Sequence, residues 1–216
     1  MLHAASKPRL RGVSHRVAFL VAPFLGLALL AVASAHGARA LIACSIYAVT
    51  LVALFGVSAG YHRSRARPEI IARWRRADHS TIFLMIAGTY TPLCLLGVGG
   101  HTGWQMLALI WGGAALGVMR ATLWTYAPRS VSAVLYVTMG WFLAAYLGVI
   151  RASIGDVLLG GIVLGGVLYT VGALIYAVRR PNPAPATFGY HEIFHLLVIA
   201  AALCHFAVVV QLARAA

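Results

Sequence analysis

The sequence predicts an all-α membrane protein, a bundle of seven transmembrane helices. Its 216 residues are 62% hydrophobic and only 10% charged, and the mean hydropathy is +0.88. Soluble domains contain about 25% charged residues, so this composition indicates a membrane protein. The apolar residues gather into seven stretches, each close to the ~20 residues that an α-helix needs to cross a bilayer. The basic residues collect in the connectors between them.

Each expected helix corresponds to one apolar stretch, and the short connectors predict antiparallel neighbours. We expect one transmembrane domain, residues 1–216, that includes a short basic cytoplasmic tail, residues 1–16. The basic start and Ala33-Ser34-Ala35 resemble a secretory signal peptide, but the apolar run is long for one. We therefore expect this run to be the first helix. The expected spans are 17–35, 41–61, 79–97, 104–120, 131–150, 156–178 and 190–212.

The distribution of positive charge predicts the orientation of the helices. The net charge is +13, which would also suit a nucleic-acid-binding protein. However, 14 of the 17 Lys and Arg residues fall on one side of the membrane if the N-terminus lies in the cytoplasm. Such asymmetry is what the positive-inside rule produces. We expect a multi-pass protein of the cell inner (plasma) membrane, with its C-terminus outside and no nucleic-acid partner.

Two weaker patterns concern packing. Gly161 and Gly165 form a small-xxx-small pattern, which favours a close contact between helices. The three cysteines, Cys44, Cys94 and Cys204, fall in apolar stretches without metal-type spacing, so we interpret them as core residues.

Polar residues converge on the cytoplasmic ends of three predicted helices. His191 and His195 are four residues apart, so they lie on one helix face. Ser58 and His62 have the same spacing on the second helix, and Asp78 begins the third. With the expected orientation, all five residues lie at the same membrane depth. Ionisable groups inside a membrane helix are rare and mark functional sites.

Three imidazoles and one open position are typical of a catalytic zinc site. Asp78 would hold or deprotonate a water there, and Ser58 would orient that water or stabilise an oxyanion. Imidazoles also suit iron, copper and nickel. Simpler interpretations exist: His62 as an interfacial residue, and Asp78 as an ion-pair partner of Arg75 or Arg76.

The other histidines are weaker candidates. His15 is at the right depth to line the site. His205 lies about 15 Å along the helix from His195, too far to share a metal, and we expect it to form a hydrogen bond within the bundle. His79 points about 100° away from Asp78, which favours a structural role.

The run from His191 to His195 also matches H-E-x-x-H, the zincin signature. In an intramembrane metalloprotease Glu192 would be the general base. Alternatively, Glu192 would lie at a helix N-terminus, where the helix dipole favours a carboxylate.

Three blocks resemble the hemolysin III family, within the progestin and adipoQ receptor superfamily. Ser58-Ala59-Gly60-Tyr61-His62 resembles its S-x3-H element. The block DHSTIFLMIAGTYTP, residues 78–92, and the block FGYHEIFH, residues 188–195, follow in the family's order. The sequence departs from the family's N-terminal E-x2-N-x3-H element, because Pro8 and Arg11 precede His15 at those positions.

The resemblance implies a seven-helix bundle with zinc near the inner side. It implies that His62, His191 and His195 are the ligands, that Asp78 contacts a metal-bound water and that Ser58 lies beside the site. The related receptors carry Gln at the position of Glu192, which argues against this residue as an obligatory base. The similar alkaline ceramidases imply hydrolysis of a lipid amide.

We therefore expect a zinc-dependent membrane hydrolase that cleaves an amide of a lipid-like, ceramide-type substrate, with membrane lipids as its partners. Two alternatives remain. One is a receptor-like or sensor protein with a structural zinc, and the other is the metalloprotease.

Overall fold

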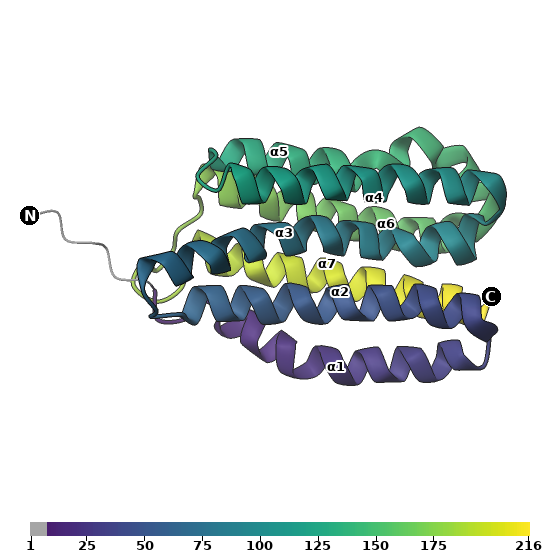
Figure 1. The fold of residues 1–216 in the computed structure, drawn as a ribbon, viewed down its shortest axis with the longest axis horizontal. Helices are drawn as coiled ribbons and strands as arrows, with labels where there is room; N and C mark the ends of the chain where they lie inside the picture. Colours follow the sequence, from purple (N-terminus) through teal and green to yellow (C-terminus); the bar gives the residue numbers. More distant parts are fainter. Residues whose placement is uncertain (1–7) are drawn as a thin grey trace, which may run out of the picture.

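The computed structural model describes residues 8–216, which form helices and short connectors running along one bundle axis (Figure 1). The all-α prediction is confirmed. The elements are α1 (Val13–Ser34), α2 (Gly37–Arg63), α3 (Pro68–Pro92), the π-helix η1 (Leu93–Val98), α4 (Gly100–Leu123), α5 (Arg129–Gly140), the 3₁₀-helix η2 (Trp141–Tyr146), α6 (Leu147–Val178) and α7 (Tyr190–Arg214).

Six helical segments within residues 8–216 are long and apolar enough to cross a membrane, which makes this a multi-pass membrane protein. Five of them match single predicted spans. The sixth, Arg129–Val178, is 50 residues long and contains the two predicted spans 131–150 and 156–178. The other five are Val13–Ser34, Gly37–Arg63, Pro68–Val98, Gly100–Leu123 and Tyr190–Arg214.

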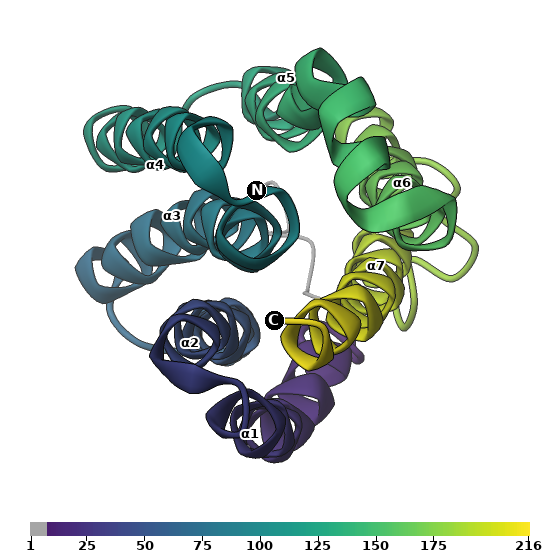
Figure 2. The same cartoon turned by 90° about the vertical axis from the view of Figure 1, so that its right-hand side faces the viewer.

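The 50-residue segment is broken at Gly155. This residue has φ 76° and ψ 171°, a conformation outside the helical region that glycine adopts because it lacks a Cβ. Trp141 Nε1 donates a hydrogen bond to Thr170 Oγ1 at 2.8 Å. The chain before the break therefore lies beside the chain after it, and Figure 2 shows α5 next to α6.

The helices extend beyond the apolar stretches that predicted them. α3 begins at Pro68 rather than at residue 79, because proline fits the first turn of a helix, where its missing N–H needs no partner. α1 begins at Val13, so the last part of the expected tail is helical. Residues 1–7 of that tail lie outside the described residues.

Small residues let the helices approach closely. A Cβ on Gly88 of α3 would collide with Thr50 of α2. Gly161 and Gly165 of α6 face Val208 and His205 of α7, so the predicted close contact at this glycine pair is confirmed. Large apolar side chains such as Phe24, Leu123 and Val157 point outward and are more than two-thirds exposed, as expected of a surface that faces lipid.

α2 ends and α7 begins at the same end of the bundle, on the left in Figure 1. We call this end, which carries His62 and His191, the histidine end. α1 begins there as well, whereas α7 ends at the opposite end (Figure 1).

Candidate metal centre

Three histidines from two helices meet at the histidine end. His62 lies in the last turn of α2, and His191 and His195 lie in the first turns of α7. Their exposed fractions are 8%, 7% and 1%. One ring nitrogen from each lies within 4.8 Å of the others, so the cluster can hold a metal ion. The structure thus brings together the three side chains that the sequence suggested as ligands.

The spacing of the ring nitrogens fits a tetrahedral metal. The Nε2 atoms of His62 and His191 are 3.1 Å apart. Two imidazoles that bind Zn²⁺ at 2.0–2.1 Å with tetrahedral angles have their nitrogens about 3.3 Å apart. In addition, His195 Nδ1 is buried and has no hydrogen-bond partner among residues 8–216. Buried polar atoms normally have a partner, so this donor set fits a bound cation.

His15 of α1 packs directly on this cluster. Its ring stacks on that of His195, with centroids 3.8 Å apart and planes 10° from parallel. Its Nδ1 lies 2.8 Å from the hydroxyl oxygen of Ser58. The expectation that His15 lines the site is confirmed. The pairing of His15 with Ser58 was not predictable from the sequence, because the two residues belong to different helices.

Asp78 lines the same cavity as the three histidines. It interacts with the Ser58 hydroxyl, which joins it to His15. No ion pair with Arg75 or Arg76, the simpler interpretation, is formed in the described structure.

The neighbours of Asp78 have other contacts. Arg76 donates a hydrogen bond to Thr125 at 2.9 Å, and the Arg75 guanidinium lies 4.9 Å from the centre of the Tyr126 ring. His79 Nδ1 donates to the carbonyl oxygen of Arg75 at 2.8 Å, which agrees with a structural role.

Glu192 is held by two donors at the start of α7. Arg11 Nε donates to Oε1 at 2.6 Å, and the backbone N–H of Gly189 donates to Oε2 at 2.8 Å. The prediction that Glu192 lies at a helix N-terminus is confirmed. The sequence did not predict this role of Arg11, which departs from the family's N-terminal element.

The segment that carries Arg11 is fixed to the loop before α7. The backbone N–H groups of Arg9 and Leu10 donate to the carbonyl oxygens of Ala186 and Thr187 at 3.0 and 3.1 Å. The N-terminal segment therefore lies across the histidine end and orients α7 through the pair of Arg11 and Glu192.

A cavity of about 280 Å³ adjoins the three histidines. Ser58 and Asp78 line it at the histidine end, together with Arg11, Arg75 and Arg129. It continues along α7 as far as His205. His205 Nε2 lies 3.0 Å from the carbonyl oxygen of Ile162, so the expected hydrogen bond within the bundle is confirmed.

These features define a multi-pass membrane protein with a buried three-histidine cluster that opens on an internal cavity. The chain belongs to the family of Haemolysin-III related proteins, which matches residues 3–206. The family resemblance noted in the sequence is thereby confirmed.

Similar proteins occur in bacteria and animals. The chain is 32% identical to Hemolysin-3 of Bacillus cereus over 168 residues, which cover 77% of this chain and 74% of that protein. It is 29% identical to the Adiponectin receptor protein of Drosophila melanogaster over 173 residues, 72% of this chain and 39% of that protein. Monocyte to macrophage differentiation factor of Homo sapiens is 28% identical over 173 residues, 74% of this chain and 66% of that protein.

Proposed function

We propose that this protein is a zinc-dependent membrane hydrolase that cleaves an amide bond in a ceramide-type lipid. One observation carries the proposal: three buried imidazoles with ligand atoms within 4.8 Å of one another adjoin a cavity of about 280 Å³ that Asp78 and Ser58 also line. Protein ligands to catalytic zinc typically number three, which leaves one position for water or substrate.

His62, His191 and His195 would hold Zn²⁺. When bound at such a site, zinc activates water for attack on a carbonyl near neutral pH. Asp78 accepts the proton at its carboxylate. Ser58 orients the reacting groups through its hydroxyl, which is itself fixed by His15 at 2.8 Å. The mostly apolar wall of the cavity along α7 would hold the hydrocarbon chain of the lipid.

The proposed topology has seven membrane crossings, with the histidine end in the cytoplasm. A straight helix of 50 residues would be about 75 Å long, more than twice the ~30 Å hydrocarbon core. The break at Gly155 supports two crossings within Arg129–Val178 instead. An odd number of crossings also agrees with α1 beginning and α7 ending at opposite ends of the bundle (Figure 1). The arginine-rich connectors favour a cytoplasmic histidine end, and we place the protein in the inner membrane of the cell as part of this proposal.

The test is to measure zinc per chain and ceramide turnover for purified wild type and His191→Ala. We expect about one zinc and measurable turnover in wild type, and loss of both in the variant. His101→Ala is the matched control, because His101 is exposed at the start of α4, and it should change neither quantity. Full zinc loading of wild type without turnover of any lipid amide would contradict the hydrolase.

A receptor-like protein with a structural zinc is the second candidate, favoured by the similarity to the Adiponectin receptor protein. A structural site usually has four protein ligands, and Asp78, which lines the adjoining cavity, is the candidate for the fourth. Asp78→Asn separates the two candidates. Retained zinc with lost turnover supports the hydrolase, whereas lost zinc supports the structural site.

A further inference from the structure

Two buried polar atoms remain without a partner at the far end of the cavity. They are the hydroxyl oxygen of Tyr169 on α6 and Nδ1 of His205 on α7, neither of which has a hydrogen-bond partner among residues 8–216. The centroids of the two rings lie 5.6 Å apart, and the ring planes are tilted by 53°. Both residues line the cavity that begins at the three histidines. Buried polar atoms in proteins are nearly always paired with a protein group or an ordered water, so these two atoms can accommodate a polar partner in the cavity.

The hydrogen-bonding roles of the two atoms are fixed by their surroundings. A backbone carbonyl only accepts hydrogen bonds, so His205 Nε2, 3.0 Å from Ile162 O, carries the proton. The only carboxylate that lines the cavity within the described chain is Asp78, at the histidine end, so a charged His205 would lack a counter-charge. In the neutral ring Nδ1 is therefore an acceptor, and the Tyr169 hydroxyl is free to donate.

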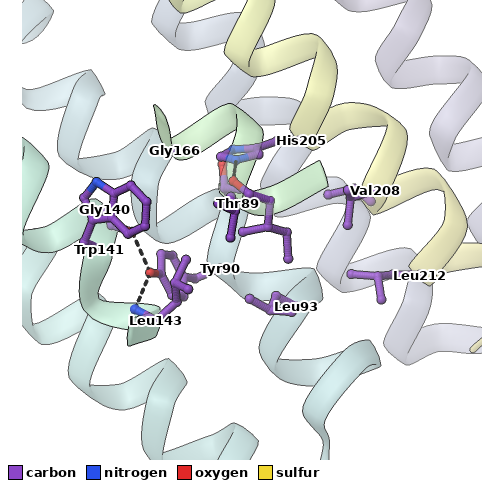
Figure 3. A pocket seen from close by; sticks show the side chains of 13 residues that line it. Thr89, Tyr90, Leu93, Gly140, Trp141, Leu143, Gly166, His205, Val208 and Leu212 are labelled. Carbon is purple, nitrogen blue, oxygen red and sulfur yellow. Dashed lines mark hydrogen bonds between the residues drawn. The ribbon is translucent and has the colours of Figure 1, made fainter. Parts of the chain in front are cut away.

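The absence of a side chain at Gly165 makes room for the His205 ring. A Cβ on Gly165 would collide with its Nε2, so glycine is required for the ring to reach the carbonyl of Ile162. Nearby polar groups already donate elsewhere: Thr89 to the carbonyl of Met85, and Tyr90 to that of Gly140. Figure 3 shows a smaller pocket that adjoins this end, where Thr89 and His205 lie on its wall and the Tyr90 hydroxyl is fixed between Gly140 and Leu143.

We propose that Tyr169 and His205 form a subsite for a neutral hydroxyl group of the ligand. A hydroxyl both donates and accepts, so it pairs with the His205 acceptor and the Tyr169 donor at once, whereas a carbonyl would satisfy only Tyr169. The subsite lies about 15 Å along α7 from His195. It therefore selects amphiphiles with a hydroxyl in the middle of the hydrocarbon chain. This inference rests on the proposed function, because it places the polar end of the ligand at the three histidines.

The test uses long-chain fatty acids, which are products of the proposed reaction and are not consumed by it. Purified protein is incubated with equal amounts of a saturated acid and its counterpart with a mid-chain hydroxyl, and the bound lipids are quantified by mass spectrometry. We expect wild type to bind about tenfold more of the hydroxylated acid than of the saturated acid. This ratio corresponds to the net free energy that one hydrogen bond contributes. An acid with its hydroxyl next to the carboxylate should show no such excess.

The variant Tyr169→Phe removes only the hydroxyl that donates to the ligand. It should therefore bring the ratio of bound hydroxylated acid to bound saturated acid close to one. Tyr47→Phe is the matched control, because Tyr47 is another tyrosine in the interior of the bundle but does not line the cavity, and it should keep the wild-type ratio. Equal binding of both acids by wild type, as expected if water alone satisfies these atoms, would overturn the subsite. So would an unchanged ratio in Tyr169→Phe.

The binding experiment and the turnover assay test the subsite and the hydrolase separately. A tenfold ratio without amide turnover contradicts the hydrolase and supports the subsite. Amide turnover with equal binding of the two acids contradicts only the subsite.

Discussion

The Nε2 atoms of His62 and His191 lie 3.1 Å apart, although the two residues are separated by 129 positions in the sequence. Two imidazole nitrogens at this distance need a proton or a cation between them, because two lone pairs repel each other. A metal shared by these rings would tie the end of α2 to the start of α7. Binding and stability should therefore be coupled.

Metal removal should lower the thermal stability of wild type. A ligand that binds only the folded state at a thousand times its Kd stabilises that state by about 4 kcal/mol. We expect a chelator to lower the unfolding temperature of the purified protein by several degrees, and zinc to restore it. His62→Ala should be insensitive to both additions. The same response to chelator in wild type and variant would show that the effect does not come from this site.

His15→Phe should separate the two contacts of His15. The aromatic ring can still stack on His195, but the nitrogen that holds the Ser58 hydroxyl is lost. We expect near-normal zinc content and turnover reduced at least about tenfold, as is typical when a positioned polar group loses its support. Ser58→Ala should have a similar effect, and the double variant should be no worse than the single ones, because both act through one contact. Additive losses would contradict this account.

Glu192→Gln should retain the turnover of wild type within a few fold. Both carboxylate oxygens are engaged, by Arg11 Nε and by the Gly189 N–H, so Glu192 serves as a helix cap. Loss of the buried charge pair should lower the free energy of unfolding by about 1–3 kcal/mol. Unfolding measurements and turnover assays on the same preparation check both parts. A folded, zinc-loaded variant without activity would instead favour Glu192 as general base, as in a metalloprotease.

Gly88→Ala should destabilise the contact of α2 with α3. The new Cβ would collide with Thr50, and overpacking of this kind costs about 1–3 kcal/mol. Gly112→Ala is the control, because a Cβ on Gly112 meets no atom within 4 Å. There alanine should be neutral or slightly stabilising, since it favours the helix. Unfolding temperatures in detergent measure both effects, and equal stability of the two variants would contradict the packing.

Helix positions and the three-histidine cluster were predictable from the sequence. Apolar length identified the spans, the i, i+4 spacing placed His191 and His195 on one face, and charge asymmetry placed His62 at the same depth. These are properties of single helices and of the membrane. The break at Gly155 also agrees with the boundary expected between spans 131–150 and 156–178.

Contacts between helices were not predictable in the same way. The pairing of His15 with Ser58, and that of Arg11 with Glu192, depends on how α1 packs against α2 and α7. The periodic pattern of apolar residues in a single sequence does not specify how helices pack against one another. The unpaired state of the Tyr169 hydroxyl and of His205 Nδ1 was unpredictable for the same reason, because it becomes visible only when the neighbouring residues are known.

We propose that His62, His191 and His195 bind one metal ion together. X-ray absorption spectroscopy at the zinc edge of the purified protein tests it most directly. We expect about one zinc per chain, with three imidazole nitrogens at about 2.0–2.1 Å and one oxygen ligand. A protein without metal, or a zinc with sulfur ligands at about 2.3 Å, would contradict it.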